Sequence, residues 1–456
     1  MKYRKLIPFA ALLLTFHQFF VLDVYAYIDP VTGSAVLTLL AGALAAVVMT
    51  LKFYWFKIKT KFSGNLSKEN NAEIIDNSGF VSEWAELKKI NLLSQDERSI
   101  IFYAENKASM NHFSSLIHEL TEKMNLQICY VTSVKDDPIL FTKNQRILPF
   151  YIGDGTARTK FFSSLKAKIL VTDMPDLGKL HIKRSDEYPV HYIYLFHSMY
   201  SVHSYLRKGA IDNYDTIFCV GPYQIKEIRE TEKVYGLKAK KLINYGYGRL
   251  DTLLQNKVNS QTTNSNAKDL IIIAPSYGGD NLLERCGIKL IDILLKSDFR
   301  VMVRPHLRTL RDSTELIDSI KKKFGKNSNF VLETGVITFD SLNNSLCMIS
   351  DWSGISLEYA FTFERPVIFI DVPKKILNPN WGDITLEPIE TSIRDKIGHI
   401  VSQNNLEEIL ELVRILDKNT QNISQLIKEM REKTVYNIGG SAKIGAQYIR
   451  QLHDSS

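Results

Sequence analysis

The sequence has 456 residues, of which 45% are hydrophobic and 23% are charged, and its formal net charge is +7 at pH 7. This length is too great for one ordinary hydrophobic core and predicts two or three domains, and the composition excludes a mainly disordered chain. The modest positive charge forms no concentrated basic stripe, which argues against a nucleic-acid partner and favours a membrane surface or a phosphorylated substrate.

Two apolar segments open the chain. Residues 1–26 combine a basic start, an apolar run and small residues at the end, which is typical of a signal peptide or a short signal-anchor helix. Residues 31–56 begin with an uncharged stretch of about 20 residues, the length that spans a bilayer, and predict a transmembrane helix. By the positive-inside rule the lysines that follow are cytoplasmic. We therefore expect a single-pass or hairpin anchor in the cell membrane, with the remaining domains in the cytoplasm.

Residues 57–97 are polar except for one amphipathic patch, and they predict a juxtamembrane linker. Short apolar runs then alternate with helical periods over residues 98–255. This pattern predicts an α/β domain with a parallel sheet covered on both faces. The expected strands are Ser99–Tyr103, Gln127–Thr132, Lys168–Thr172, His191–Phe196 and Thr216–Val220, and the expected helices are Met110–Met124 and Tyr223–Val234.

A polar, Asn- and Ser-rich segment, residues 256–268, predicts a linker to a second α/β domain over residues 269–403. Residues 404–456 read as helices with an interruption at Asn437–Ser441. Two doubly wound domains, a linker and a helical tail describe the GT-B architecture, in which the active site is the cleft between the domains. In the second domain the expected strands are Leu270–Ile273 and Arg300–Val303, and the expected helices are Leu282–Leu295 and Ser313–Phe324.

The stretch Leu346–Asp371 reads as strand, tight turn, helix and strand. At such a turn the Ser353 hydroxyl, the small Gly354 and the first free N–H groups of the helix can face one phosphate. One turn later, Glu358 is a candidate for ribose hydroxyls. We expect Asp351 to orient the Ser353 loop or a neighbouring histidine and not to bind metal. The alternative is an ordinary βαβ connection with a polar N-cap.

Two further turns carry imidazoles at the carboxyl ends of strands, where ligands gather in open α/β sheets. His197 is suited to remove a proton from an acceptor hydroxyl, with a hydrogen-bonded loop histidine as the alternative and His203 as the rival candidate. Arg304 and His306 can both reach a phosphate, the arginine by a bidentate fork and the histidine by one donated hydrogen bond. For that pair the alternative is charge balance at the surface.

Two glycine-containing turns are weaker candidates. Ser276 lies in a turn that either brings the backbone to the donor or acceptor or is only a flexible loop. Gly440 and Ser441 either add backbone N–H groups to the phosphate site or form a helix break with a serine cap. The sequence contains no GxxxxGK[ST], GxGxxG or HExxH motif, so P-loop, dinucleotide-binding and zincin classes lack support, and neither a metal ion nor a cofactor is expected.

Taken together, these pieces resemble the CDP-glycerol glycerophosphotransferase family, in order and over roughly residues 99–452. His197 is similar to the family's His-Gly motif, and residues 274–276 to its Ala-Pro-Thr turn. Residues 304–307 are similar to its His-Pro motif, and residues 350–354 with Glu358 to its Ser/Thr-Asp-Tyr-Ser-Ser block. The sequence departs from these patterns at Ser198, at Gly354 and at residues 276–278.

The resemblance implies a GT-B fold with His197 as catalytic base and with His306 and the Ser353 turn holding the donor's diphosphate. It implies a metal-independent reaction in which a hydroxyl of a lipid-linked or glycan acceptor attacks the glycerol-bearing phosphorus of a CDP-activated polyol donor and CMP leaves. The products belong to teichoic-acid-type or capsular polymers. Two alternatives stay open: a GT-B glycosyltransferase that uses a sugar nucleotide, and a non-catalytic, membrane-tethered nucleotide-binding scaffold.

Overall fold

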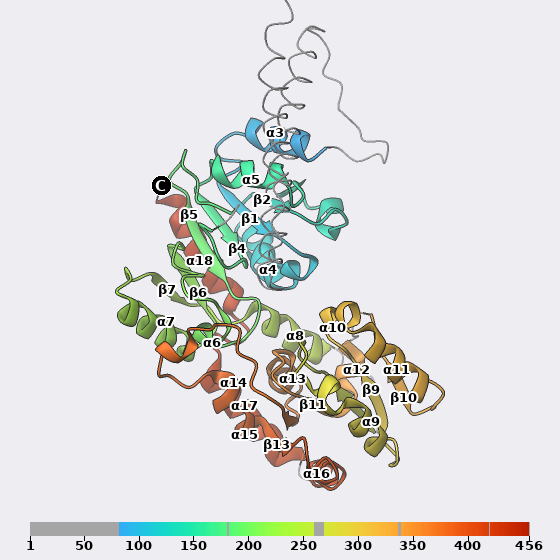
Figure 1. Cartoon of the computed structure of the whole chain (residues 1–456). Coiled ribbons are helices and arrows are strands. Elements are labelled where there is room, and N and C mark those ends of the chain that lie inside the picture. Colours follow the sequence, from blue (N-terminus) through green and yellow to red (C-terminus); the bar gives the residue numbers. More distant parts are fainter. Residues whose placement is uncertain (1–81, 180–181, 260–268, 336–338, 419, 456) are drawn as a thin grey trace, which may run out of the picture. The chain divides into compact units, whose positions relative to one another are not determined.

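A computed structural model describes residues 82–179, 182–259, 269–335, 339–418 and 420–455 (Figure 1). The predicted apolar segments, residues 1–26 and 31–56, lie outside these residues, as does most of the predicted linker 57–97. Within the described ranges no helix is both long enough and apolar enough to cross a membrane. The described residues belong to one compact unit, which contains two separate sheets.

The first sheet has seven parallel strands in the order β3-β2-β1-β4-β5-β6-β7. Most of these strands are continuous apolar runs, because a parallel sheet is buried on both faces. In β1, for example, Ile101 and Tyr103 enter one core, and Ile100 and Phe102 enter the other. The strands are β1 Ile100–Ala104, β2 Ile128–Thr132, β3 Ile147–Tyr151, β4 Ile169–Thr172, β5 His191–Leu195, β6 Thr216–Cys219 and β7 Lys241–Asn244.

Helices cover both faces of this sheet (Figure 1). The predicted helix 110–124 is an α-helix followed by one π-helical turn. The predicted linker 256–268 begins inside α8, which runs to Asn259. The elements are α3 Glu83–Leu92, η1 Lys107–Ser109, α4 Met110–His118, η2 Glu119–Lys123, η3 Pro138–Phe141, α5 Thr156–Ser163, α6 Val202–Tyr205, α7 Pro222–Tyr235 and α8 Gly248–Asn259.

Several elements of the first sheet domain are absent from the sequence prediction, among them two strands and the first helix. Strand β3 contains Pro149, which cannot donate to a ladder and is confined to sheet edges, and β7 is an edge strand with exposed polar ends. Helix α3 falls inside the predicted linker 57–97 but packs on β3 and α5, with Leu87 and Ile90 in the core. The first sheet domain therefore includes residues from Glu83 onward, so its predicted start at residue 98 is corrected.

The second sheet has six parallel strands in the order β10-β9-β8-β11-β12-β13, the same winding as the first. The predicted strand, turn, helix and strand of 346–371 are confirmed as β11, α13 and β12. The strands are β8 Leu270–Ile273, β9 Arg300–Val303, β10 Phe330–Leu332, β11 Ser345–Ser350, β12 Val367–Asp371 and β13 Gly398–Ser402. The helices are η4 Leu283–Gly287, α9 Ile288–Leu294, α10 Leu307–Asp312, α11 Thr314–Phe324, α12 Phe339–Asn343, α13 Ile355–Phe363, η5 Trp381–Asp383, α14 Ile389–Ser392 and α15 Arg394–Ile397.

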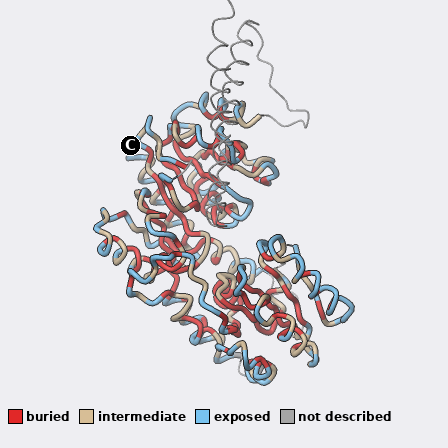
Figure 2. The backbone as a smooth tube through the Cα atoms, in the orientation of Figure 1, coloured by how far each residue is buried: buried red, intermediate tan, exposed pale blue. Residues whose placement is uncertain are grey.

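The chain ends in α16 Glu408–Lys418, α17 Thr420–Thr434 and α18 Ser441–Asp454, with the predicted interruption between the last two. Helix α17 packs on α13 and α15 beside the second sheet, whereas α18 returns to the first sheet and packs on α4, α8 and β4 (Figure 1). There Ala446 and Ile449 enter the same core as Phe218 and Tyr245. Buried residues are concentrated along the strands of both sheets (Figure 2).

Helix α3 offers a matched test of where the first sheet domain begins. Leu87 is 3% exposed and Leu92, on the same helix, is 75% exposed. Leu87→Ala should lower the free energy of unfolding by about 2–5 kcal/mol, because it removes buried methyl groups and leaves a cavity. Leu92→Ala should change it by less than about 0.5 kcal/mol. Urea unfolding of the full chain followed by tryptophan fluorescence measures both, and equal effects would contradict the packing of α3.

Candidate active site

A buried carboxylate joins the two sheet domains. Helix α13 is almost wholly buried, and its Glu358 needs partners there, since an unpaired buried charge is costly. Tyr247 comes from the turn between β7 and α8, and Arg249 comes from the first turn of α8. The Tyr247 hydroxyl donates to Glu358 Oε1 at 2.7 Å, and Arg249 Nε donates to Oε2 at 2.8 Å. A ribose hydroxyl would therefore have to share a Glu358 oxygen with one of these donors.

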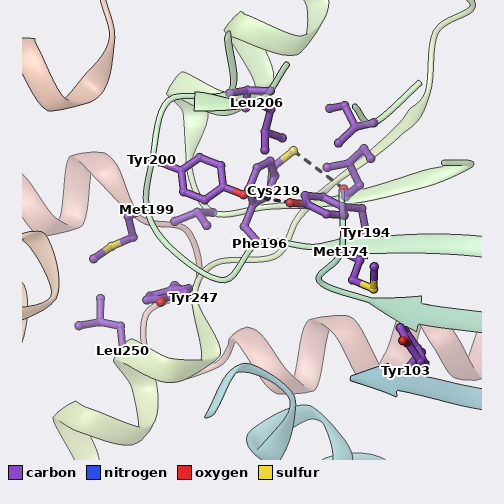
Figure 3. Packing of buried hydrophobic residues seen from close by; sticks show 14 of the residues in the cluster. Tyr103, Met174, Tyr194, Phe196, Met199, Tyr200, Leu206, Cys219, Tyr247 and Leu250 are labelled. Carbon is purple, nitrogen blue, oxygen red and sulfur yellow. Dashed lines mark hydrogen bonds between the residues drawn. The ribbon is translucent and has the colours of Figure 1, made fainter. Parts of the chain in front are cut away.

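His197 lies directly after β5 and close to this junction. Its neighbours Phe196 and Met199 are fixed in the core beside Tyr247 and Leu250 (Figure 3). The Tyr247 hydroxyl lies 3.0 Å from the His197 carbonyl oxygen. The ring hydrogen-bonds to the backbone of Asp173, and burial lowers the pKa of His197 below its ordinary 6.5. His197 is thus neutral at pH 7, with one ring nitrogen donating to a carbonyl and the other able to accept a proton.

Sequence reasoning missed a second imidazole beside His197. The ring of His112, on α4, lies 6.1 Å from the His197 ring and stacks on Tyr247 at 6.2 Å. His112 is buried, and among the described residues its Nδ1 has no hydrogen-bond partner. Burial, and then the charges of His197 and Arg249, lower its pKa to about 3. The available signal was its position on the apolar stripe of a helix, which is an unusual place for a histidine.

Arg304 follows β9 and lies within electrostatic range of Arg249 and Glu358. Its side chain is half-buried, and burial lowers its pKa. Across the part of the chain that the structure describes, its guanidinium makes neither an ion pair nor a hydrogen bond. A guanidinium has five N–H donors and cannot lose its charge, so this side chain is suited to bind an anion.

His306 follows Arg304 closely and caps α10. Its Nδ1 accepts a hydrogen bond from the Arg308 amide at 3.0 Å. Burial, and then the charges of Lys375 and Arg308, lower its pKa to about 4, so the ring is neutral at pH 7. A neutral imidazole that accepts at Nδ1 carries its proton on Nε2. His306 can therefore donate one hydrogen bond to a phosphate oxygen, which fits the role predicted for it.

Two cations that sequence reasoning did not single out lie around Tyr277. Lys375 Nζ lies 3.0 Å from the centre of the Tyr277 ring, and the Arg308 guanidinium lies 4.8 Å from it. The His306 ring is 4.7 Å away. Burial lowers the pKa of Lys375 to about 8, which still leaves most of it charged at pH 7. This group is a second concentration of positive charge beside the arginine at the end of β9.

The turn between β11 and α13 brings Ser353 and Gly354 to His197. The Ser353 carbonyl accepts from the Ser356 amide at 3.1 Å and from the Ser356 hydroxyl at 2.7 Å. Among the described residues the Ser353 hydroxyl has no partner, so it is available to a ligand. A Cβ placed on Gly354 would lie 2.5 Å from the Oγ of Ser198, the residue after His197. The predicted anion turn and the predicted base are therefore neighbours.

The Asp351 side chain binds the backbone of Ser276 and not the Ser353 loop or His306. The buried Asp351 carboxylate accepts from the backbone amides of Ser276 at 2.7 Å and of Leu282 at 2.9 Å. Asp351 thus fixes the turn after β8, and the expectation that it orients the Ser353 loop or His306 is corrected. The physical reason is that these two buried amides would otherwise lack acceptors.

Gly440 and Ser441 lie at the start of α18, which is bound to α8. The Asp251 carboxylate, on α8, accepts from the amides of Gly439 at 2.7 Å and Ser441 at 2.9 Å. These bonds hold the start of α18 against α8, the helix that carries Arg249. The structure does not bring the two residues to the anion turn, and it favours the alternative of a capped helix break.

The rival histidine, His203, is buried in a separate polar network. Its Nδ1 lies 3.1 Å from the Ser201 hydroxyl and 3.5 Å from a Glu227 oxygen. Glu390 of α14 accepts from the Ser201 amide at 2.9 Å. His203 therefore supports the end of the His197 loop from inside. Across the described ranges, no group of three or more His, Cys, Asp or Glu side chains is placed to hold a metal ion.

Comparisons with known proteins show the family and the fold. A profile of the family described as CDP-Glycerol:Poly(glycerophosphate) glycerophosphotransferase matches residues 86–436. Two solved structures are similar in fold. The wall teichoic acid polymerase TagF has a TM-score of 0.53 at 15% identity, over 82% of this chain and 94% of its own. A putative UDP-N-acetylglucosamine 2-epimerase from Listeria monocytogenes has a TM-score of 0.52 at 12% identity, over 79% of this chain and 98% of its own. No curated protein matches the chain.

The buried His112 should make stability depend on pH. Because its folded-state pKa is lowered from 6.5 to about 3, the unfolded chain binds a proton below pH 6.5 that the folded chain does not. Stability is therefore lost as the pH falls, by about 2 kcal/mol at pH 5. In urea unfolding, the free energy of unfolding of His112→Gln should therefore fall by about 2 kcal/mol less than that of the wild type between pH 7 and pH 5. The exposed His118, on the same helix, gives the control His118→Gln, and identical slopes for all three proteins would contradict the burial of His112.

Proposed function

The chain belongs to the CDP-glycerol:poly(glycerophosphate) glycerophosphotransferase family, and from that premise we propose that it transfers glycerol phosphate from CDP-glycerol to a hydroxyl of a lipid-linked or glycan acceptor, releasing CMP. The polymer is of the teichoic-acid or capsular type. One observation at the site carries the proposal. The half-buried guanidinium of Arg304 has no anion partner among the described residues, and it lies within electrostatic range of Arg249 and Glu358, close to His197. A partly desolvated charge of this kind is stabilised by a bound anion.

The reaction follows from the residues around Arg304. A ring nitrogen of His197 removes the proton from the acceptor hydroxyl as that oxygen attacks the glycerol-bearing phosphorus. The bond between this phosphorus and the bridging oxygen breaks, and CMP leaves with the electron pair. Arg304, the Nε2–H of His306 and the Ser353 hydroxyl stabilise the negative charge on the phosphate oxygens. The proton held by His197 then passes to solvent.

His197 and Arg304 should separate chemistry from binding. His197→Gln should lower the rate of CMP release by at least about 100-fold, because the base is lost, and leave CDP affinity within about 2-fold. Arg304→Gln should weaken CDP binding by about 10- to 100-fold, because a charge-assisted, bidentate contact is lost. CMP release from CDP-glycerol with a lipid-linked acceptor and calorimetric titration with CDP measure the two effects.

The same titration discriminates between the possible functions. A wild-type protein that binds UDP more tightly than CDP and CMP would point to a glycosyltransferase that uses a sugar nucleotide. CDP binding without CMP release from CDP-glycerol or CDP-ribitol, and with no difference between wild type and His197→Gln, would point to a non-catalytic scaffold. Arg304→Lys keeps the positive charge but lacks the planar fork of the guanidinium. If it loses CDP binding and CMP release as Arg304→Gln does, the contact depends on the fork and not on the charge alone.

We also propose that the protein works at the cytoplasmic face of the cell membrane, anchored by residues 31–56. The uncharged stretch and the lysines that follow it support this placement. After alkaline extraction of membranes from expressing cells, the full chain should remain in the pellet, and a variant without residues 2–56 should be released. Retention of that variant in the pellet would contradict anchoring by these segments.

A further inference from the structure

Gly354 and Ser198 compete for one small space where the two sheet domains meet. A Cβ on Gly354 would lie 2.5 Å from Ser198 Oγ and 3.7 Å from Ser198 Cβ, which is too close for the first pair. The backbone of Gly354 has φ −61° and ψ −22°, a conformation that every L-residue adopts. The backbone therefore does not require glycine at position 354. A side chain there would instead displace the Ser198 hydroxyl from its present position.

Within the described residues the Ser198 hydroxyl has no hydrogen-bond partner. Its neighbour Met199 is fixed in the core (Figure 3), and the carbonyl of His197 lies 3.0 Å from the Tyr247 hydroxyl. Ser198 itself is only half-buried. A hydroxyl with two unused acceptor sites and one unused donor, on a fixed backbone beside the Ser353 turn, is suited to contact a ligand bound there.

We propose that the Ser198 hydroxyl binds a phosphate oxygen of the nucleotide donor at the Ser353–Gly354 turn, in the space that a side chain at position 354 would fill. This inference rests on the proposed function, because it names a further contact in the same donor site. Two neutral hydroxyls, from Ser353 and Ser198, then bind the phosphate from opposite domains. Donor binding is thereby coupled to the placement of His197, the residue next to Ser198.

A double-mutant cycle tests this contact. Ser198→Ala removes the hydroxyl and should weaken CDP binding by about 5-fold, the value expected for one neutral hydrogen bond. Gly354→Ala should have a similar effect, because the added methyl group turns the hydroxyl away. Since Oγ is the end of a rotatable side chain, neither change should alter the melting temperature by more than about 2 °C. The double variant should be no weaker than either single variant.

A double variant in which serine and glycine exchange positions 198 and 354, here called the exchanged pair, gives the decisive test. Ser198→Gly combined with Gly354→Ser returns one hydroxyl to the same space and should restore CDP affinity to within about 2-fold of wild type, although Gly354→Ser alone should weaken it. The exposed Ser319 of α11 gives the matched control Ser319→Ala, which should bind CDP as wild type does. All variants are made in the full chain.

Two results would overturn the inference. The first is wild-type CDP affinity in Ser198→Ala, and the second is an exchanged pair that binds no better than Gly354→Ser alone. If the wild-type protein releases CMP from CDP-glycerol in either case, only this inference fails. If the wild type neither binds CDP nor releases CMP, the proposed function itself fails, so the two failures are distinguished.

Discussion

The ion pair and hydrogen bond of Glu358 are the contacts on which the arrangement of the site depends. This carboxylate lies in a buried helix and is stable there only because Tyr247 and Arg249 satisfy both of its oxygens. Both donors come from the other sheet domain, and Tyr247 also reaches the carbonyl of His197. Glu358 thereby joins the helix that starts at the anion turn to the other sheet domain, close to the loop that carries the base. Removing Arg249 would leave a buried charge unpaired, and removing the Tyr247 hydroxyl would leave one oxygen of the carboxylate without its donor.

Carboxylates elsewhere near the site are occupied in the same way. Asp351 binds amides of the turn after β8, and Asp251 binds amides at the start of α18. Because these acidic groups accept from the protein's own amides, they do not compete with an anionic ligand for the free donors of the site. Among the described residues, the groups left without protein partners include the guanidinium of Arg304 and the hydroxyls of Ser353 and Ser198. These free donors and the cations Arg304, Arg308 and Lys375 together favour an anionic ligand.

The rule that ligands gather at the carboxyl ends of parallel strands led to His197, Arg304 and His306 from the sequence, and in the structure each of them follows a strand. The fold class and most strands were also predictable, since their apolar runs are continuous. What the sequence did not reveal was pairing over long separations. Glu358 lies 109 residues from Arg249, and Asp351 lies 75 from Ser276, so no local pattern connects them. Edge strands were missed because burial, the main signal, is weakest there, and the membrane segments remain a prediction.

Helix α18 has a consequence for how the protein is made. It follows the whole second sheet domain in the chain, yet Ala446 and Ile449 complete a core that begins with β1. During synthesis, every strand of the first sheet therefore leaves the ribosome long before α18, which covers part of one face of that sheet. During that interval Phe218 and Tyr245 lack their final packing partners, and the exposed apolar surface favours association with chaperones or with other chains. Folding of the first domain thus finishes last, although its synthesis starts first.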